Sequence, residues 1–502
     1  MVKFSDLKIK NLKNVILISL CVIFVFTSCS SSKESNSQKS NSGNQQVVGD
    51  VKYEKCGNFL CATIKVPLDY KKPKGKKIDI AIRTLSAGIP SKKKGILLIN
   101  PGGPGGSGVD FVESASGIIS QVVLDEFDIV GWDPRGVGQS SKLKCTAYNL
   151  DFLFDDIDYS PDDEAELSAL EDVNKKIGED CVEDNPDLAK HLNSKDATRD
   201  MDEIRKSLGE KQLNYLGFSY GTVLGQLYAT MFPKNYRAMV IDGVVDVGEN
   251  PLESAGNQGI GFEKAFDSFF EYCREVTCKY SKDQDPKAVY AQLSKQVDAT
   301  PIKTQDLVES YVGPAQFDLG TGVYMYGGRE SWPSLDDALT ALQSGETSGI
   351  MLGYDSYLGR SGSGIYDGSY ASFLSILCAD GKLASGEDLY AYGKSIAEKA
   401  PLFGEAVVLL GAQCSFWPNA TDAKAFKVNN SKGNNIMIIG TTGDPATPVQ
   451  ASRDVAKKLQ NSSYVEFKGE GHTAYGRSNA CVDNTINSYF IDLKSPKSNT
   501  YC

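Results

Sequence analysis

The chain has 502 residues, of which 41% are hydrophobic and 23% are charged, values ordinary for a globular protein. This length exceeds what one compact core usually holds, so two domains or one core with a large insertion are expected. The net charge is −11, or −14 without residues 1–28, which argues against nucleic acid as a partner.

Residues 1–28 have the pattern of an export signal. Lysines precede an apolar run, residues 15–26, that is too short to span a bilayer. Cys29 follows this run after the small residues Thr27 and Ser28, an arrangement that resembles a bacterial lipobox, so we expect lipid on Cys29 and anchoring to the membrane at the cell surface. The alternative is a plain secretory signal with an incidental cysteine, which would give a secreted protein. Residues 29–50 are rich in Ser, Asn, Lys and Gln and are predicted to form a disordered tether.

The cysteines favour a disulfide framework. Cys21 leaves with the signal and Cys29 takes the lipid, so ten of the twelve cysteines remain for an oxidising compartment. A metal site is not expected, because the chain has no C-x-x-C and only two histidines. Connectivity is not fixed by sequence alone, but local spacing and chain order suggest the pairs Cys56–Cys61, Cys145–Cys181, Cys273–Cys278, Cys378–Cys414 and Cys481–Cys502.

The segment 51–249 alternates short apolar runs with amphipathic stretches, as βαβ units do. The continuous apolar character of these runs is typical of strands buried on both faces of a parallel sheet. Residues 197–208 form an amphipathic helical pattern before one of these strands. Strands are predicted at residues 78–83, 95–100, 127–132, 213–216 and 238–242.

Residues 250–400 differ in character, because strand-like runs are few and helical patterns alternate with Gly/Ser/Tyr-rich loops. Strand signals return within residues 401–502, where runs at 435–440 and 464–467 flank a helix at 449–459. We therefore predict an α/β fold with a mostly parallel central sheet. Residues 51–249 and 401–502 would form its core, and residues 250–400 an inserted, largely helical cap.

Residues 217–221 read Gly-Phe-Ser-Tyr-Gly, a G-x-S-x-G turn between a predicted strand and a predicted helix at 222–232. In this context the turn is a candidate nucleophile elbow that would expose the hydroxyl of Ser219. The small glycines would let strand and helix pack closely around a strained backbone. A five-residue motif with three fixed positions is weak evidence by itself, so the prediction depends on finding a catalytic base and acid for Ser219.

A serine nucleophile needs a base, and that base needs an orienting acid. His472, in a glycine-rich turn after a predicted strand, is favoured over His191, which lies in a polar stretch. Asp444 follows the preceding strand and is the predicted acid, with a helix cap or turn former as its alternative role. The chain order Ser219, Asp444, His472 is that of α/β-hydrolases.

The glycine-rich loop 100–108 follows a predicted strand. An oxyanion hole would combine the backbone N–H of Tyr220 with one from this loop, and we favour Gly103, with Gly102 close behind. The loop also contains a formal G-x-G-x-x-G, the fingerprint of a dinucleotide site. Pro104 within it and the predicted export both count against a nucleotide cofactor, and no cofactor is expected.

With these motifs, residues 66–70, 133–136 and 414–418 make the chain resemble α/β-hydrolases of the proline iminopeptidase-like class. Within that class it resembles the secreted tripeptidyl aminopeptidase branch over nearly the whole mature chain. Pro101 stands where proline iminopeptidases have histidine, which favours the tripeptidyl branch. The resemblance implies that Asp133 and Arg135 support the glycine loop.

The resemblance also implies a serine exopeptidase that releases tripeptides from peptides with a free N-terminus, through an acyl-enzyme on Ser219. Such an enzyme needs a carboxylate in the cap for the substrate ammonium, and Glu253, Glu263 and Glu271 all remain candidates. A carboxylesterase or lipase with the same three residues is the alternative reaction, because fold does not determine function. A non-catalytic binding lipoprotein is the alternative of another class.

Overall fold

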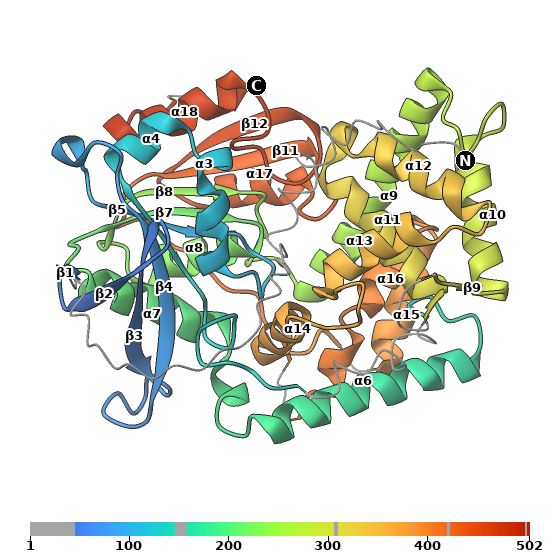
Figure 1. Cartoon of the computed structure of the whole chain (residues 1–502), viewed down its shortest axis with the longest axis horizontal. Helices are drawn as coiled ribbons and strands as arrows, with labels where there is room; N and C mark the ends of the chain where they lie inside the picture. The colour runs from blue at the N-terminus through green and yellow to red at the C-terminus, as the bar shows by residue number, and fades with distance from the viewer. Residues whose placement is uncertain (1–45, 146–157, 306–309, 385, 419–421, 497–498) are drawn as a thin grey trace, which may run out of the picture.

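The computed structural model describes residues 46–145, 158–305, 310–384, 386–418, 422–496 and 499–502 (Figure 1). The predicted signal and Cys29 lie outside these ranges. The described chain forms an eleven-stranded sheet in the order β1-β2-β3-β4-β6-β5-β7-β8-β11-β12-β13. Within the described ranges no helix is long and apolar enough to cross a membrane.

The strands from β6 to β13 in this order all run parallel, which confirms the predicted sheet. Alternate residues of each strand face opposite sides, as in β5, where Leu97 and Ile99 belong to one hydrophobic cluster and Leu98 to the other. Helices cover both faces, so both sets of side chains are buried. The parallel strands are β6 (Asp128–Trp132), β5 (Ile96–Asn100), β7 (Leu213–Phe218), β8 (Tyr236–Asp242), β11 (Ile436–Gly443), β12 (Ser462–Glu470) and β13 (Thr500–Tyr501).

The other end of the sheet is antiparallel and begins earlier than predicted. β1 (Gln46–Val48) pairs with β2 (Val51–Cys56) in a hairpin. The predicted tether therefore extends too far, because residues 46–48 form a strand of the sheet and residues 49–50 form the turn that follows it. Gly49, at φ +60°, makes the tight turn that a left-handed backbone permits. The sheet continues through β3 (Phe59–Pro67) and β4 (Lys77–Leu85).

Two layers of helices enclose the sheet. On one face lie α7 (Ser194–Ser207), α8 (Tyr220–Met231) and α17 (Val449–Lys458), whose buried residues share one hydrophobic cluster. On the opposite face lie α2 (Gly108–Phe111), α3 (Ala115–Ile118), α4 (Gln121–Glu126) and α18 (Ala480–Asp492), which contribute to the second cluster.

The chain leaves the sheet after β8 and returns at β11, and the intervening cap is largely helical and lies beside the sheet (Figure 1). Its helices continue past the predicted boundary at residue 400, since α16 (Gly404–Leu409) packs against the first cap helix and a 3-10 turn follows at Ala412–Ser415. The larger cap helices are α9 (Pro251–Val276), α10 (Pro286–Ala299), α11 (Pro314–Tyr326), α12 (Trp332–Leu342), α13 (Ser348–Leu358), α14 (Ser369–Asp380) and α15 (Gly386–Ala397).

A helix that precedes the elbow in the sequence also packs against the cap. α6 (Glu164–Asp184) runs along the cap, where Gly178 lies so close to Phe416 that a Cβ would sit 3.3 Å from its carbonyl oxygen (Figure 1). No sequence pattern indicated this contact across the chain. The structure contains the five suggested disulfides, Cys56–Cys61, Cys145–Cys181, Cys273–Cys278, Cys378–Cys414 and Cys481–Cys502.

Candidate active site

Ser219 occupies the sharp turn between β7 and α8. Its backbone has φ 53° and ψ −123°, in a region that side-chain-bearing residues rarely occupy, and its N–H donates to the carbonyl of Asp242 at 2.9 Å. The flanking glycines are required, because a Cβ on Gly217 would lie 2.5 Å from the carbonyl oxygen of Gly221. The turn therefore has the geometry of a nucleophile elbow.

A cavity of about 1470 Å³ lies at this turn, between the sheet and the cap. Ser219, His472 and the glycine-rich loop line it from the core. Tyr326 and Tyr357 of the cap line it as well. The position agrees with the general placement of ligand sites beyond the carboxyl ends of parallel strands.

Asp444 and His472 are in direct contact. Both carboxylate oxygens of Asp444 lie 2.9 Å from Nδ1 of His472. The carboxylate also accepts hydrogen bonds from the N–H of Ala446 at 3.0 Å, the N–H of Thr447 at 2.9 Å and the Thr447 hydroxyl at 2.8 Å. This orients the carboxylate toward the imidazole, which then keeps its proton on Nδ1 and leaves Nε2 as a free acceptor.

His472 Nε2 is buried and has no hydrogen-bond partner in the described chain. Ser219 and His472 line the same cavity without a hydrogen bond between them in the described residues. Such contacts are commonly long in ligand-free sites and tighten with substrate. The cap contacts the same histidine. The backbone N–H of His472 donates to the Tyr326 carbonyl at 2.9 Å, and the two rings meet edge to face with their centres 5.3 Å apart.

The two oxyanion-hole candidates in the glycine-rich loop, Gly102 and Gly103, differ in their contacts. The Gly102 N–H donates to the side chain of Asn100 at 3.0 Å, so it is already used. A Cβ on Gly102 would lie 2.8 Å from the Cβ of Ser219 and 3.1 Å from the nitrogen of Tyr220, which shows how closely the loop approaches the elbow. This geometry favours Gly103 over Gly102 as the partner of Tyr220.

Sequence reasoning missed Asp242, the last residue of β8. Its fully buried carboxylate accepts hydrogen bonds from the backbone N–H groups of Ala474, at 3.0 and 3.1 Å, and Tyr475, at 2.8 Å. Its own carbonyl holds the N–H of Ser219. Asp242 thus ties the elbow to the loop of His472. The sequence signal that could have indicated Asp242 is a charged residue at the end of an otherwise apolar predicted strand.

The stability of the protein should depend on the ionisation of Asp242. Burial raises its pKa to about 6, above the usual 3.8, although the N–H groups of Tyr475 and Ala474 oppose the shift. A carboxyl group whose pKa is raised by folding destabilises the folded state when ionised. Wild type should therefore gain about 2 kcal/mol over Asp242→Asn as pH falls from 7 to about 4. Urea unfolding at several pH values measures the difference, and a constant difference would contradict the assignment.

The two predicted supporting residues have structural contacts and do not line the cavity. Asp133 accepts from the Ser107 hydroxyl at 2.7 Å and so holds the end of the glycine-rich loop. Arg135 is fully buried and forms a two-point contact with Asp200 at 2.7 and 2.8 Å. His191, the weaker candidate base, lies 3.5 Å from Asp196 and is also absent from the cavity wall.

The three candidate amine-binding glutamates are in different surroundings. Glu263 is 4% exposed and paired with Lys287 at 2.8 Å, which gives it a structural role. Glu271 is exposed and pairs with Arg274 on the surface. Only Glu253 of these three lines the cavity.

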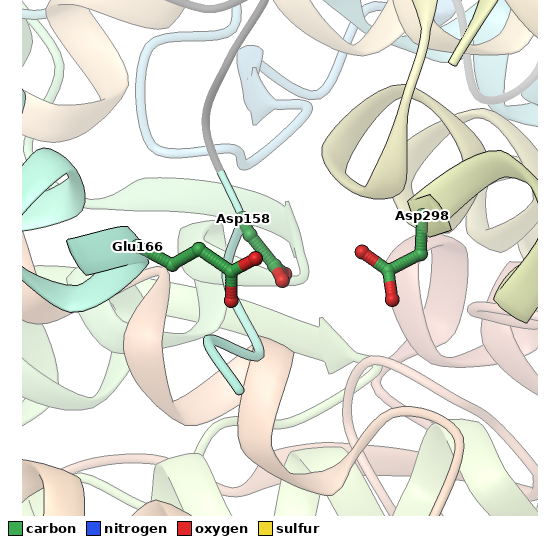
Figure 2. Close-up of side chains that lie close together, drawn as sticks. All are labelled: Asp158, Glu166 and Asp298. Carbon is green, nitrogen blue, oxygen red and sulfur yellow. The ribbon is translucent and has the colours of Figure 1, made fainter. Parts of the chain in front are cut away.

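Three carboxylates of the cap region lie close enough to hold a metal ion, Asp158, Glu166 at the start of α6 and Asp298 at the end of α10 (Figure 2). Their nearest oxygens lie within 4.8 Å of one another. Burial and the neighbouring acids raise the pKa of Asp158, while the Ser160 N–H and hydroxyl bind one of its oxygens. None of the three lines the cavity beside Ser219, so the group has no place in its chemistry.

Comparison with known proteins agrees with this geometry. Residues 95–283 match the family model described as alpha/beta hydrolase fold, and residues 400–502 match the one described as TAP-like protein. The chain is 30% identical over 468 residues to "Serine protease Hip1" of Mycobacterium tuberculosis, covering 89% of this chain and 88% of that protein. It is 33% identical over 458 residues to "Carboxylesterase B" of the same species, covering 88% and 86%.

A third relative is "Tripeptidyl aminopeptidase" of Streptomyces coelicolor, 28% identical over 444 residues, covering 86% of this chain and 80% of that protein. The matches extend across the sheet, the elbow and the cap, and not only over one motif. This breadth agrees with the sheet order, the helical insertion and the serine turn described above. The chain is a serine hydrolase and belongs to the TAP-like α/β-hydrolase family.

Proposed function

We propose that the protein is a serine exopeptidase that releases tripeptides from free N-termini, with Ser219, Asp444 and His472 as its catalytic triad. The observation that carries this proposal is the Asp444–His472 pair, whose histidine lines the same cavity as the elbow serine and has no hydrogen-bond partner on Nε2 among the described residues. Gly103 and Tyr220 would supply the oxyanion hole.

In the proposed reaction, Nε2 of His472 takes the proton of Ser219 as Oγ attacks the scissile carbonyl. The N–H groups of Tyr220 and Gly103 stabilise the oxyanion that forms. His472 then gives its proton to the leaving amine, and the C–N bond breaks. Water repeats the sequence on the acyl-enzyme, releasing the short peptide and restoring the serine.

The substrate part of the proposal rests on the relatives and on the cavity. Two of them carry names that denote peptide cleavage. A volume of about 1470 Å³ exceeds what a small ester needs, because pockets for drug-sized ligands measure roughly 300–1,000 Å³. The cap forms one wall of this cavity, which would suit an extended peptide end.

Carboxylester hydrolysis is the second candidate, favoured by the 33% identical relative named carboxylesterase. One experiment separates the two: an unblocked peptide, its N-acetylated form and a short acyl ester are incubated with the enzyme, and products are identified by mass spectrometry. We expect tripeptides from the free peptide and far slower cleavage of the acetylated one. Cleavage of the ester with both peptides intact would establish the second candidate.

We also propose export with a lipid on Cys29. The arrangement of residues 1–28 supports this, together with the five disulfides, which need an oxidising compartment. Metabolic labelling with a fatty acid tests it. A labelled wild type with an unlabelled Cys29→Ala variant is expected, and a labelled variant would disprove attachment at this residue.

A further inference from the structure

Asp380 is a carboxylate that faces the cavity without being part of the proposed triad. It is the last residue of α14, a cap helix that lies next to the sheet (Figure 1). It lines the same cavity as Ser219, and the residue is exposed although much protein surrounds its carboxyl group. Desolvation by that surrounding protein raises its pKa to about 6, against the hydrogen bonds that it accepts.

A short chain of hydrogen bonds connects Asp380 to the elbow. The Ser194 N–H donates to one oxygen of Asp380 at 2.8 Å, and the Ser194 hydroxyl donates to the other. Since the serine proton is used in this way, the Tyr220 hydroxyl donates to Ser194, at 2.6 Å. Tyr220 directly follows Ser219, so the position of Asp380 is fixed relative to the nucleophile.

Asp380 still has capacity to accept hydrogen bonds. An ionised carboxylate offers about four lone-pair sites, and the described contacts occupy one on each oxygen. The neighbouring cation Lys195 has its ammonium 5.4 Å from the centre of the Phe426 ring and forms no ion pair with Asp380 in the described chain. An ammonium group arriving from the cavity would therefore find unused acceptors.

The length of α14 between the glycine-rich loop and Asp380 is similar to that of a short peptide. The N-terminal half of α14 touches the glycine-rich loop, since a Cβ on Gly105 would lie 2.7 Å from the nitrogen of Phe373. From Phe373 to Asp380 the helix advances roughly 10 Å. An extended tripeptide spans roughly 9–10 Å from its amino nitrogen to its last carbonyl carbon, whereas a dipeptide spans only roughly 6 Å.

The other acidic residues of the cavity wall are less suitable. Asp246 is 5% exposed and paired with Lys458. Glu249 already accepts from Asn257 at 2.7 Å, and Asp454 is paired with Lys457 at 2.9 Å. Glu253 lies in the first turn of α9, with no comparable connection to the elbow among the described residues.

We propose that Asp380 binds the substrate's α-ammonium group and, by its distance from Ser219, sets the released peptide at three residues. This inference rests on the proposed exopeptidase function. The carboxylate and ammonium would form a charge-assisted hydrogen bond inside a partly desolvated cavity, where such contacts are stronger than on the surface. Asp380 would then be a specificity-determining residue, not a member of the triad.

Asp380→Asn tests the proposal, because asparagine retains an acceptor for the Ser194 N–H and removes the charge. Wild type and variant are assayed on a chromogenic tripeptide amide with a free N-terminus and on its N-acetylated form. The ratio of the two kcat/KM values should fall by about 30-fold or more in the variant, mainly through the free-amine substrate. General damage to the site would instead lower both values together and leave the ratio unchanged.

Glu253→Gln and Glu271→Gln are the matched comparisons, one on the cavity wall and one on the surface. The assignment would be overturned if the ratio of kcat/KM for the free and acetylated substrates fell in Glu253→Gln and stayed unchanged in Asp380→Asn. If Asp380→Asn does not fold, Asp380→Glu keeps the charge and should keep the preference for the free amine; its loss there would also count against the proposal. Should wild type cleave no tripeptide amide at all, the proposed function itself fails, independently of Asp380.

Discussion

Replacing Ser219 by alanine is expected to lower kcat by about 10⁵- to 10⁶-fold while the protein remains folded. Alanine keeps the Cβ, so the backbone at φ 53° is no more strained than in wild type. What is lost is the oxygen that would form the acyl-enzyme. Hydrolysis of a chromogenic tripeptide amide measures the rate, and thermal unfolding shows whether the fold is intact.

The matched control is Ser395→Ala, an exposed serine of α15 whose hydroxyl donates only to the nearby Tyr392 carbonyl among the described residues. This variant should keep wild-type activity. A fluorophosphonate probe should label wild type and the control but not Ser219→Ala. Retained turnover in Ser219→Ala, or a label mapped to another serine, would refute the proposed nucleophile.

Asp444→Asn should lower kcat by about 10⁴-fold with little change in KM. The carboxylate now accepts from Nδ1 of His472 and from the N–H groups of Ala446 and Thr447. An asparagine turned to keep the backbone contacts presents its NH₂ group to the imidazole, which moves the proton to Nε2. His472 can then no longer accept the proton of Ser219.

Steady-state kinetics on the tripeptide amide provide the measurement. Asp492→Asn is a suitable control, since Asp492 pairs with Lys494 on the surface and does not line the cavity. A loss confined to KM, or a variant within a few-fold of wild type, would show that Asp444 acts only as the turn former that its sequence context also allows.

Much of the proposed site could be predicted because its parts depend on local rules. The elbow requires glycines around Ser219 whatever the rest of the fold does, since a Cβ on Gly217 would meet Gly221 four residues later. Asp444 and His472 each follow a strong strand signal, and the carboxyl ends of parallel strands meet at one edge of the sheet. The mostly parallel character of the sheet followed from the alternation of apolar and amphipathic segments, whereas the order of its strands came only from the structure.

The β1 hairpin and the cap were predicted less well. A three-residue strand at the end of a polar segment carries little periodic signal, so the tether was drawn five residues too long. The helix α6 precedes the elbow in sequence but packs on the cap, and its burial pattern does not identify its partner. Helical periodicity indicates that a face is buried but not against which element.

By itself, the sequence determined the fold class, the elbow at Ser219 and the two strand-end residues proposed as its partners, because each depends on residues adjacent in the chain. Only the tertiary structure showed that the Gly102 N–H is bound to Asn100, revealed Asp242 beneath the histidine loop, and brought Asp380 into the cavity. These features depend on hydrogen bonds between segments up to about 230 residues apart, as from Asp242 to Ala474. Local propensity carries no information on such contacts, since they form only when the packed elements bring their ends together.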